Sequence, residues 1–324
     1  MAASLKPYLK RFQGRRIAVA GDFMLDHTIW GQASRLSSEA PVPVLETAEE
    51  TFHPGGAGNV AANLAALGAD VLPLGVLGRD WAGRILRREL RRRGIATDGL
   101  LTDPARPTTT KLRIIETARK HQVARADRET TEPIAAGLAG KLVDQLTEHR
   151  FDAVIFSDYD KGVVTPALLQ QVLPRLHMME VPVFLDPRPR HAAAYHPLTV
   201  LTPNRKEAEQ MVGFPVESER DLRRAGRKLL EMTEGSAVLI TRGDQGMALM
   251  ERRGRLHLIP TVAREVYDVT GAGDTVIAVM ALAHAAGASF LDSARLANSA
   301  AGIVVGHVGT AAPSLAELAS FCTS

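Results

Sequence analysis

Residues 15–23, RRIAVAGDF, contain a short apolar run, IAVA, that closes on Gly-Asp. A short run of this kind predicts a strand buried on both faces, which is typical of parallel sheets covered by helices. Further segments repeat the pattern: 70–78 (DVLPLGVLG), 151–159 (FDAVIFSDY), 181–187 (VPVFLDP), 198–204 (LTVLTPN) and 237–246 (AVLITRGDQG). Helical patterns lie between or after them, at 59–69, 165–176, 206–212, 273–286 and 292–306. We therefore expect an α/β fold with a mostly parallel central sheet.

Two segments depart from this pattern. Residues 30–54 and 106–128 contain long stretches in which apolar and polar residues alternate. Alternation of this kind predicts half-exposed strands, so these segments suggest a small β lid beside the main sheet. Because no repeat, low-complexity tract or linker interrupts the sequence, we expect residues 1–324 to form a single domain.

Composition limits the class of protein. Hydrophobic residues make up 45% of the 324 residues, which is enough for a sizeable core. Cys322 is the only cysteine, so a disulfide framework is excluded and a reducing compartment is favoured. Neither a secretory leader nor an apolar run long enough to span a bilayer is apparent. We expect a soluble, cytoplasmic protein with no membrane partner.

The charge pattern gives little support to nucleic-acid binding. The net charge is only +3, and the densest basic run, GRILRRELRRRG (83–94), carries six arginines without interleaved aromatic residues. On a helix, the apolar residues of this run would face the core and leave a solvated arginine face. We therefore expect no nucleic-acid partner.

Common cofactor motifs are absent or lack their structural context. GAGNVA (56–61) follows TFHP instead of a buried strand, and GAGDTV (271–276) lacks the third small residue of a dinucleotide-binding loop. The sequence has no Walker-type phosphate loop, paired-cysteine metal site or G-x-S-x-G elbow.

The segment VTGAGDTVIAV (269–279) offers a different chemistry. Glycines at a helix N-terminus allow backbone N–H groups to approach an anion, and Gly271 and Gly273 stand at such a position. Asp274 follows in the first turn, where a carboxylate could accept a hydroxyl proton during phosphoryl transfer. An ordinary helix-capping aspartate explains this segment equally well when it is taken alone.

Polar residues at the ends of several predicted strands favour the functional interpretation. In open α/β sheets ligands bind at the carboxyl ends of the strands. One such end would be unremarkable, but five suggest a site for a sugar and a phosphorylated ligand. The residues at these ends are Asp22 and Asp26, Asp158 and Lys161, Asp186 and Arg188, Asn204 and Glu207, and Gly243 and Gly246.

Together, DVTGAGDT (268–275) and GGAGNVAANLAALGA (55–69) resemble the two signatures of the ribokinase-like (PfkB) carbohydrate kinases. The resemblance covers essentially the whole chain and is closest to the kinases that act on D-glycero-D-manno-heptose 7-phosphate in ADP-heptose synthesis. It implies a ribokinase-like three-layer α/β/α fold with a small β lid. The lid would close over the sugar and often forms a homodimer contact.

The resemblance also implies roles for individual residues. Asp274 would be the catalytic base beside an anion hole, ATP and Mg²⁺ would be bound nearby, and K⁺ is held in many relatives. The implied positions are Gly271, Ala272 and Gly273 for the anion hole; Asp26, Gly55, Gly56 and Asn59 for sugar hydroxyls; Asn204 and Glu207 for Mg²⁺ and the ATP phosphates; Thr241, Gly243 and Asn298 for the nucleotide; and Asp268 and Thr270 for K⁺.

A substrate 7-phosphate would need cations at the far end of the sugar pocket. Lys111, Arg113, Arg79 and Lys161 are candidates. The sequence departs from the family at Arg188, where relatives usually carry lysine and where a contact with the nucleotide phosphates is expected. It also departs at Asp160 and in PRHAAAYH (189–196).

The resemblance implies transfer of the γ-phosphoryl group of ATP to the anomeric O1 of the heptose phosphate. The product would be heptose 1,7-bisphosphate, on the route to ADP-heptose and the lipopolysaccharide core. Because the sequence has no H-x-G-H motif, we expect a separate nucleotidyltransferase to act downstream. Two alternatives remain: a kinase of the same family acting on a fructose phosphate or ribose, and a non-catalytic sugar or nucleotide sensor.

Overall fold

The computed structural model describes residues 5–263, 266–307, 309 and 311–321. Its main sheet is built from β1 (Arg16–Gly21), β4 (Asp70–Gly78), β5 (Leu100–Asp103), β8 (Ala153–Ser157), β9 (Val183–Asp186), β10 (Val200–Leu201), β11 (Ala237–Thr241), β12 (Met247–Glu251) and β13 (Leu256–Ile259). The spatial order is β13-β12-β11-β10-β9-β8-β1-β4-β5. Only the β11–β12 and β12–β13 pairs in this order are antiparallel. The predicted mostly parallel sheet is therefore confirmed.

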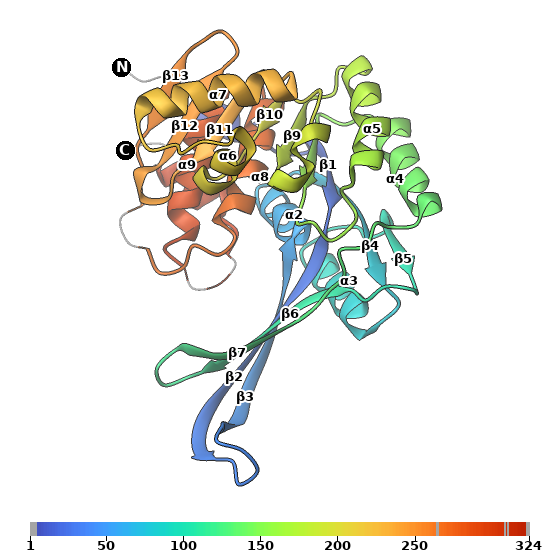
Figure 1. Ribbon diagram of the computed structural model, residues 1–324, viewed down its shortest axis with the longest axis vertical. Helices are drawn as coiled ribbons and strands as arrows, with labels where there is room; N and C mark the ends of the chain where they lie inside the picture. The colour runs from blue at the N-terminus through green and yellow to red at the C-terminus, as the bar shows by residue number, and fades with distance from the viewer. Residues whose placement is uncertain (1–4, 264–265, 308, 310, 322–324) are drawn as a thin grey trace.

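Helices cover both faces of this sheet (Figure 1). Along β1, Ile17 and Val19 belong to one hydrophobic core, whereas Ala18 and Ala20 belong to the opposite core. This alternation is the period of a strand buried on both sides. The first core is completed by α1 (Lys6–Leu9), α2 (Ala57–Ala66), α3 (Trp81–Arg92), α8 (Ala272–Ala285), α9 (Phe290–Val304) and α10 (Leu315–Phe321). The second contains α4 (Ala136–Glu148), α5 (Pro166–Met178), α6 (Arg205–Val212), α7 (Glu219–Thr233) and the 3₁₀ helix η1 (Pro189–Ala194), while the short 3₁₀ helix η2 (Gly243–Gln245) follows β11.

A second sheet projects from the molecule as an arm (Figure 1). It contains β2 (Phe23–Leu36), β3 (Pro43–Gly56), β6 (Thr109–Glu116) and β7 (His121–Arg128), in the order β3-β2-β6-β7. The first lid strand begins at Phe23, not near residue 30 as the sequence suggested. The reason is that residues 23–25 are buried at the root of the arm and therefore resemble a strand of the main sheet. Towards its tip β2 becomes exposed.

Three aromatic rings fix the root of the arm to α3. The ring centroids of His27 on β2 and Phe52 on β3 are 4.6 Å apart, and Phe52 meets Trp81 edge to face at 5.4 Å. Contacts of this geometry add to the stability given by burial alone. The arm is therefore anchored at the end where it joins the main sheet.

The arginine-rich run forms α3, as its amphipathic pattern predicted. Leu86 and Leu90 are buried, but the arginines are not all merely solvated. Arg87 donates to the carbonyl oxygens of Thr97 and Leu100, and Glu89 pairs with the arginines around it. In the part of the chain that the structure describes, no helix has the length and apolar character needed to cross a bilayer.

Candidate active site

The centre of the site is the N-terminus of α8, which lies at the edge of the main sheet where its parallel strands end. Gly271 caps the helix with φ 80°, a conformation that glycine adopts at little cost. Within the described residues, the backbone N–H groups of Gly273 and Asp274 have no backbone acceptor. Such free N–H groups at a helix N-terminus form a site for an anion.

Asp274 is almost fully buried beside these N–H groups, with 4% of its surface exposed. Its Oδ2 accepts a hydrogen bond from Asn59 Nδ2 at 2.9 Å, and its Oδ1 accepts one from the Tyr159 hydroxyl at 2.8 Å. Burial raises the pKa of Asp274 from 3.8 to about 6, although the two hydrogen bonds oppose that rise. A carboxylate that titrates near neutral pH suits general base catalysis.

Further polar side chains lie behind Asp274. Asn63 donates to the backbone oxygen of Asn59 at 2.8 Å, and the Thr275 hydroxyl donates to Asn63 Oδ1 at 2.9 Å. Tyr159, Asn63 and Thr275 were not predicted from the sequence, although Asn63 lies one helical turn after Asn59 in a segment that was. Asn59 was predicted to bind the sugar, and in the structure its amide donates to Asp274.

Asp26, on β2, lies on the lid side of Asp274, and its charge contributes to the raised pKa of Asp274. It forms an ion pair with Arg113 of β6. A Cβ atom at Gly55 would lie 2.3 Å from Asp26 Oδ2, and one at Gly56 would lie 2.6 Å from the Asp22 carbonyl oxygen. A side chain at Gly56 would therefore collide with backbone, whereas one at Gly55 would displace the Asp26 carboxylate.

Three of the four cations predicted for a substrate phosphate are paired with carboxylates. Lys161 Nζ lies 2.8 Å from Glu129 Oε1, and Lys111 Nζ lies 3.3 Å from Glu129 Oε2 and from Asp127 Oδ2. Lys111 and Lys161 thus lie together and share one acidic partner, Glu129. Arg113 is engaged with Asp26, and Arg79 is exposed.

A hollow of about 480 Å³ lies on the other side of α8. It brings together Thr241, Gly243 and Asn298, the residues predicted for the nucleotide, with Ala272 and Gly273 of the predicted anion hole. The remaining lining is mainly apolar: Asp244, Gly246, Met247, Thr261, Ala263, Val266, Val269, Val276, Ala301, Gly302 and Val305. Asn298 Nδ2 donates to the Pro260 carbonyl oxygen at 2.8 Å, so this amide helps to fix the wall of the hollow.

Asn204 and Glu207 form a capping box at the start of α6. Asn204 Oδ1 accepts from the Glu207 N–H at 3.0 Å, and Glu207 Oε2 accepts from the Asn204 N–H at 2.9 Å. Glu207 Oε1 pairs with Arg188 Nη1 at 2.7 Å. Both carboxylate oxygens therefore have partners, which the prediction of a metal role for this pair did not include.

The residues predicted for K⁺ organise a loop. Asp268 Oδ1 accepts from the Thr270 N–H at 2.9 Å, and Asp268 Oδ2 accepts from the Gly309 N–H at 3.1 Å. Among the described residues, no group of three or more His, Cys, Asp or Glu side chains is placed to hold a metal ion. A cation at either predicted position would need oxygen ligands from phosphate, water or the backbone as well.

Two of the three departures from the family pattern, Asp160 and residues 189–196, contact each other. Arg190 and His191, both in η1, face Asp160, and Arg190 Nη1 lies 3.0 Å from Asp160 Oδ2. His191 Nδ1 and the Tyr195 hydroxyl each lie 2.7 Å from Oδ2 of the fully buried Asp158, and the bond to Asp158 raises the pKa of His191. Asp160 therefore balances positive charge from η1.

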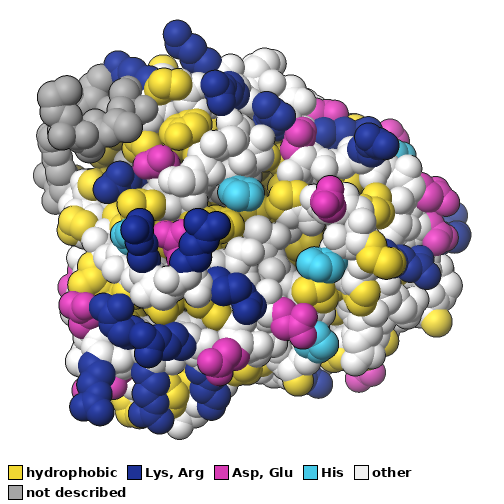
Figure 2. Space-filling model, turned by 90° about the horizontal axis from the view of Figure 1, so that it is seen from above, with side chains coloured by type: hydrophobic (Ala, Val, Ile, Leu, Met, Phe, Trp, Pro, Cys, Tyr) yellow, Lys and Arg dark blue, Asp and Glu magenta, His cyan; other side chains and the backbone are white. Residues whose placement is uncertain are grey.

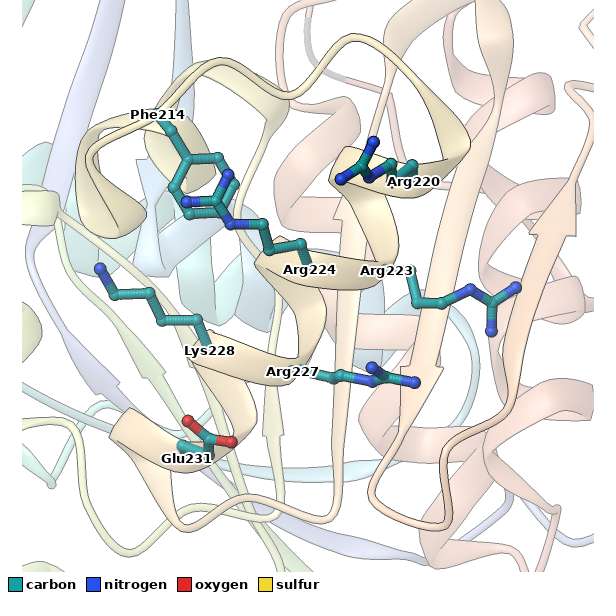
Figure 3. Close-up of a pocket in the computed structure, with 7 residues that line it drawn as sticks. All are labelled: Phe214, Arg220, Arg223, Arg224, Arg227, Lys228 and Glu231. Atoms are coloured by element: carbon teal, nitrogen blue, oxygen red, sulfur yellow. The ribbon is translucent and has the colours of Figure 1, made fainter.

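A separate basic groove lies on α7 (Figure 3). Lys and Arg side chains gather at the lower left of Figure 2, on the side of the molecule where α7 lies in Figure 1. Arg224 stacks on Phe214, and Lys228 donates to a backbone oxygen. Arg223 points to the opposite side of the helix in Figure 3 and pairs with Glu219. Because these cations do not converge on one point, we assign no substrate to the groove.

The site and the fold together define a phosphotransferase architecture: an anion-binding helix terminus, a buried carboxylate and a nucleotide-sized hollow on a parallel sheet. Residues 15–317 match the pfkB family of carbohydrate kinases, and the chain belongs to that family. It is therefore a carbohydrate kinase.

Curated relatives and solved structures agree with this assignment. The chain is 47% identical over 302 residues to the bifunctional protein HldE of Geobacter sulfurreducens, covering 93% of this chain and 61% of that protein. It is 39% identical to HldE of Gluconacetobacter diazotrophicus over 95% of this chain and 63% of that protein. The chain thus spans less than two thirds of the length of these relatives.

The structural neighbours share the fold. Arabidopsis thaliana ribokinase, complexed with ribose and ATP, has a TM-score of 0.74 and 20% identity, with 96% of this chain and 99% of that chain covered. Escherichia coli phosphofructokinase-2, in complex with potassium, has a TM-score of 0.79 and 18% identity, with the same coverage. The predicted ribokinase-like fold is therefore confirmed.

Proposed function

We propose that this kinase transfers the γ-phosphoryl group of ATP to the anomeric O1 of D-glycero-D-manno-heptose 7-phosphate, giving the 1,7-bisphosphate and ADP. The observation that carries the catalytic part is the position of Asp274, buried beside free N–H groups between the hollow and the lid. The choice of sugar rests on the resemblance of the sequence to heptose 7-phosphate kinases.

In this proposal the sugar lies between α8 and the root of the lid, and ATP occupies the hollow. Asp274 accepts the proton of the O1 hydroxyl as that oxygen attacks the γ-phosphorus. A new O1–P bond forms while the bond from the γ-phosphorus to the β–γ bridging oxygen breaks, and ADP leaves with that electron pair. The N–H groups of Gly273 and Asp274 stabilise the charge on the transferring group, with Gly271 and Ala272 shaping the loop.

Asn204 and Glu207 would hold Mg²⁺ through water or ATP oxygens, because both Glu207 oxygens already have protein partners. Mg²⁺ supplies charge neutralisation on the phosphates. Arg188 is close enough to Glu207 to reach the same phosphates, and Thr241, Gly243 and Asn298 would line the nucleotide site. Asp268 and Thr270 would organise a K⁺-binding loop.

The far end of the sugar pocket would be formed by the lid. Asp26 and the backbone at Gly55 and Gly56 would contact sugar hydroxyls. The 7-phosphate would replace Glu129, the carboxylate that Lys111 and Lys161 share, as the partner of these two lysines. A phosphate that carries two charges can compete with one carboxylate for the same ammonium groups.

The first test measures ADP release with ATP and Mg²⁺ from D-glycero-D-manno-heptose 7-phosphate, fructose 6-phosphate, fructose 1-phosphate and ribose offered separately. Preference for the heptose phosphate with a 1,7-bisphosphate product supports the proposal. Preference for another sugar keeps the role of Asp274 and rejects the heptose assignment. An Asp274→Asn protein that binds ATP but turns over none of them supports a catalytic base, and full turnover by this variant rejects it.

We further propose that residues 1–324 form one kinase domain, which works in the cytoplasm as a homodimer through the lid, and that a nucleotidyltransferase activity uses its product. The tip of the lid exposes Leu36 and Val42, with 72% and 51% of their surfaces accessible. Apolar side chains at the end of a projecting arm suit a contact with a second copy. Light scattering should find a dimer, and a double substitution of Leu36 and Val42 by lysine should give a monomer.

A further inference from the structure

We infer that Tyr159 is a positioning residue that holds the catalytic carboxylate of Asp274 in its reactive orientation. The inference rests on the proposed role of Asp274 as the base. Tyr159 follows β8, and its hydroxyl donates to Asp274 Oδ1 at 2.8 Å. Asn59, from α2, donates to the other oxygen, Oδ2. Two donors from separate parts of the chain therefore fix the plane of the carboxylate.

The ring of Tyr159 is held from its other side by Arg188. The guanidinium carbon lies 4.6 Å from the ring centroid, and Arg188 is itself paired with Glu207. A cation over an aromatic face is an attractive contact. Through this stack, Arg188, which is proposed to contact the ATP phosphates, also contacts Tyr159, the residue that orients the base.

The backbone on either side of Tyr159 is also restrained. Buried Asp22 accepts hydrogen bonds from the N–H groups of Tyr159, Lys161 and Val163, at 2.8, 3.1 and 3.1 Å. The neighbouring Asp158 accepts from His191 and Tyr195, as described above. Preorganisation of this kind is what a catalytic group requires of its supporting residues, since small errors in its position cost rate.

The charges around Asp274 come from several elements. Asp26 on β2 and Asp186 on β9 are acidic, and Arg188 after β9 is the cation. The bonds from Tyr159 and Asn59 favour the ionised form of Asp274. Burial and the charge of Asp274 raise the pKa of Tyr159 well above its usual range, so its hydroxyl remains a donor at any working pH. Removing this donor should therefore raise the pKa of Asp274.

The test is Tyr159→Phe, which keeps the ring under Arg188 and removes only the hydroxyl. We expect kcat to fall by about 10- to 100-fold with the KM for ATP nearly unchanged. The acidic limb of the pH–kcat profile should move up by about one pH unit. ATP and the sugar phosphate titrate identically with both proteins, so their ionisation cancels in the comparison. Tyr8→Phe, which removes a hydroxyl paired with Asp292 far from the site, is the matched control and should change neither quantity.

A second measurement does not depend on turnover. In protein labelled with ¹³C at aspartate carboxyl groups, Asp274→Asn identifies the Asp274 resonance, and its titration should shift upwards in Tyr159→Phe. A folded Tyr159→Phe protein with an unmoved Asp274 titration overturns the inference, whatever its kcat. That result leaves the proposed function intact, whereas turnover by Asp274→Asn would reject the proposed function itself.

Discussion

Replacing Asp274 with asparagine should make the protein more stable while it abolishes turnover. Burial holds the pKa of Asp274 at about 6, against 3.8 in an exposed chain. At neutral pH the Asp274 carboxylate is ionised in both states. Its charge is solvated less favourably inside the folded protein than in the unfolded chain. Since each pKa unit corresponds to about 1.4 kcal/mol, the cost is about 3 kcal/mol. Asparagine removes the charge, and its oxygen and amide can still pair with Asn59 and the Tyr159 hydroxyl.

Imperfect pairing of the new amide should leave a net gain of about 1–3 kcal/mol, or a rise in Tm on the order of 3 °C. The gain has a defined pH dependence. A raised carboxyl pKa destabilises the wild-type fold fully above about 6, and this cost falls progressively as the pH drops from there towards 3.8. Thermal melts at pH 8 and pH 5 should therefore show a larger difference at pH 8.

The control for this experiment is Asp144→Asn, which removes the same charge from an exposed position on α4 and should change stability by less than about 0.5 kcal/mol. Two results would refute the reasoning: an Asp274→Asn protein no more stable than wild type at pH 8, or a difference of equal size at pH 5.

Three further substitutions test the surroundings of the base. Gly55→Ala places a Cβ 2.3 Å from Asp26 Oδ2 and should lower kcat/KM for the sugar by about 10- to 100-fold. The control is Gly140→Ala, where no atom lies within 4 Å of the new Cβ and the kinetics should be unchanged. Equal effects of the two substitutions would reject the steric argument. Ala301→Phe should fill the hollow beside α8 and raise the KM for ATP at least about tenfold, measured with Tm as a check on folding. Lys161→Met should raise the KM for the sugar phosphate and not that for ATP, and the reverse pattern would remove Lys161 from the sugar side.

Local patterns were sufficient to predict much of the fold. Buried strands such as 151–159 are recognisable because continuous apolar runs have few alternatives in a soluble chain. The glycine-capped start of α8 at Gly271 was predictable for a similar reason, since glycine spacing and a following helix are properties of adjacent residues.

Contacts between distant segments were not predictable in the same way. Tyr159 and Asp274 are 115 positions apart, and nothing beside Tyr159 in the sequence indicates their hydrogen bond. The carboxylate partners of Lys111 and Lys161 were missed because β-sheet register and loop folding bring them together. At Asn204 and Glu207, the pattern predicted for a metal site is also the pattern of a capping box, and the structure contains that capping box.

One of the four strands of the projecting arm, β2, also carries Asp26. At its root this strand packs against Phe52 and α3. Its tip at Leu36 lies about ten residues from Asp26, roughly 30 Å along the strand. A contact at the tip of the arm would therefore act on the same strand that carries Asp26 at its root. If Asp26 binds the sugar and the tip binds a second copy, as proposed, the two binding events would be coupled through β2.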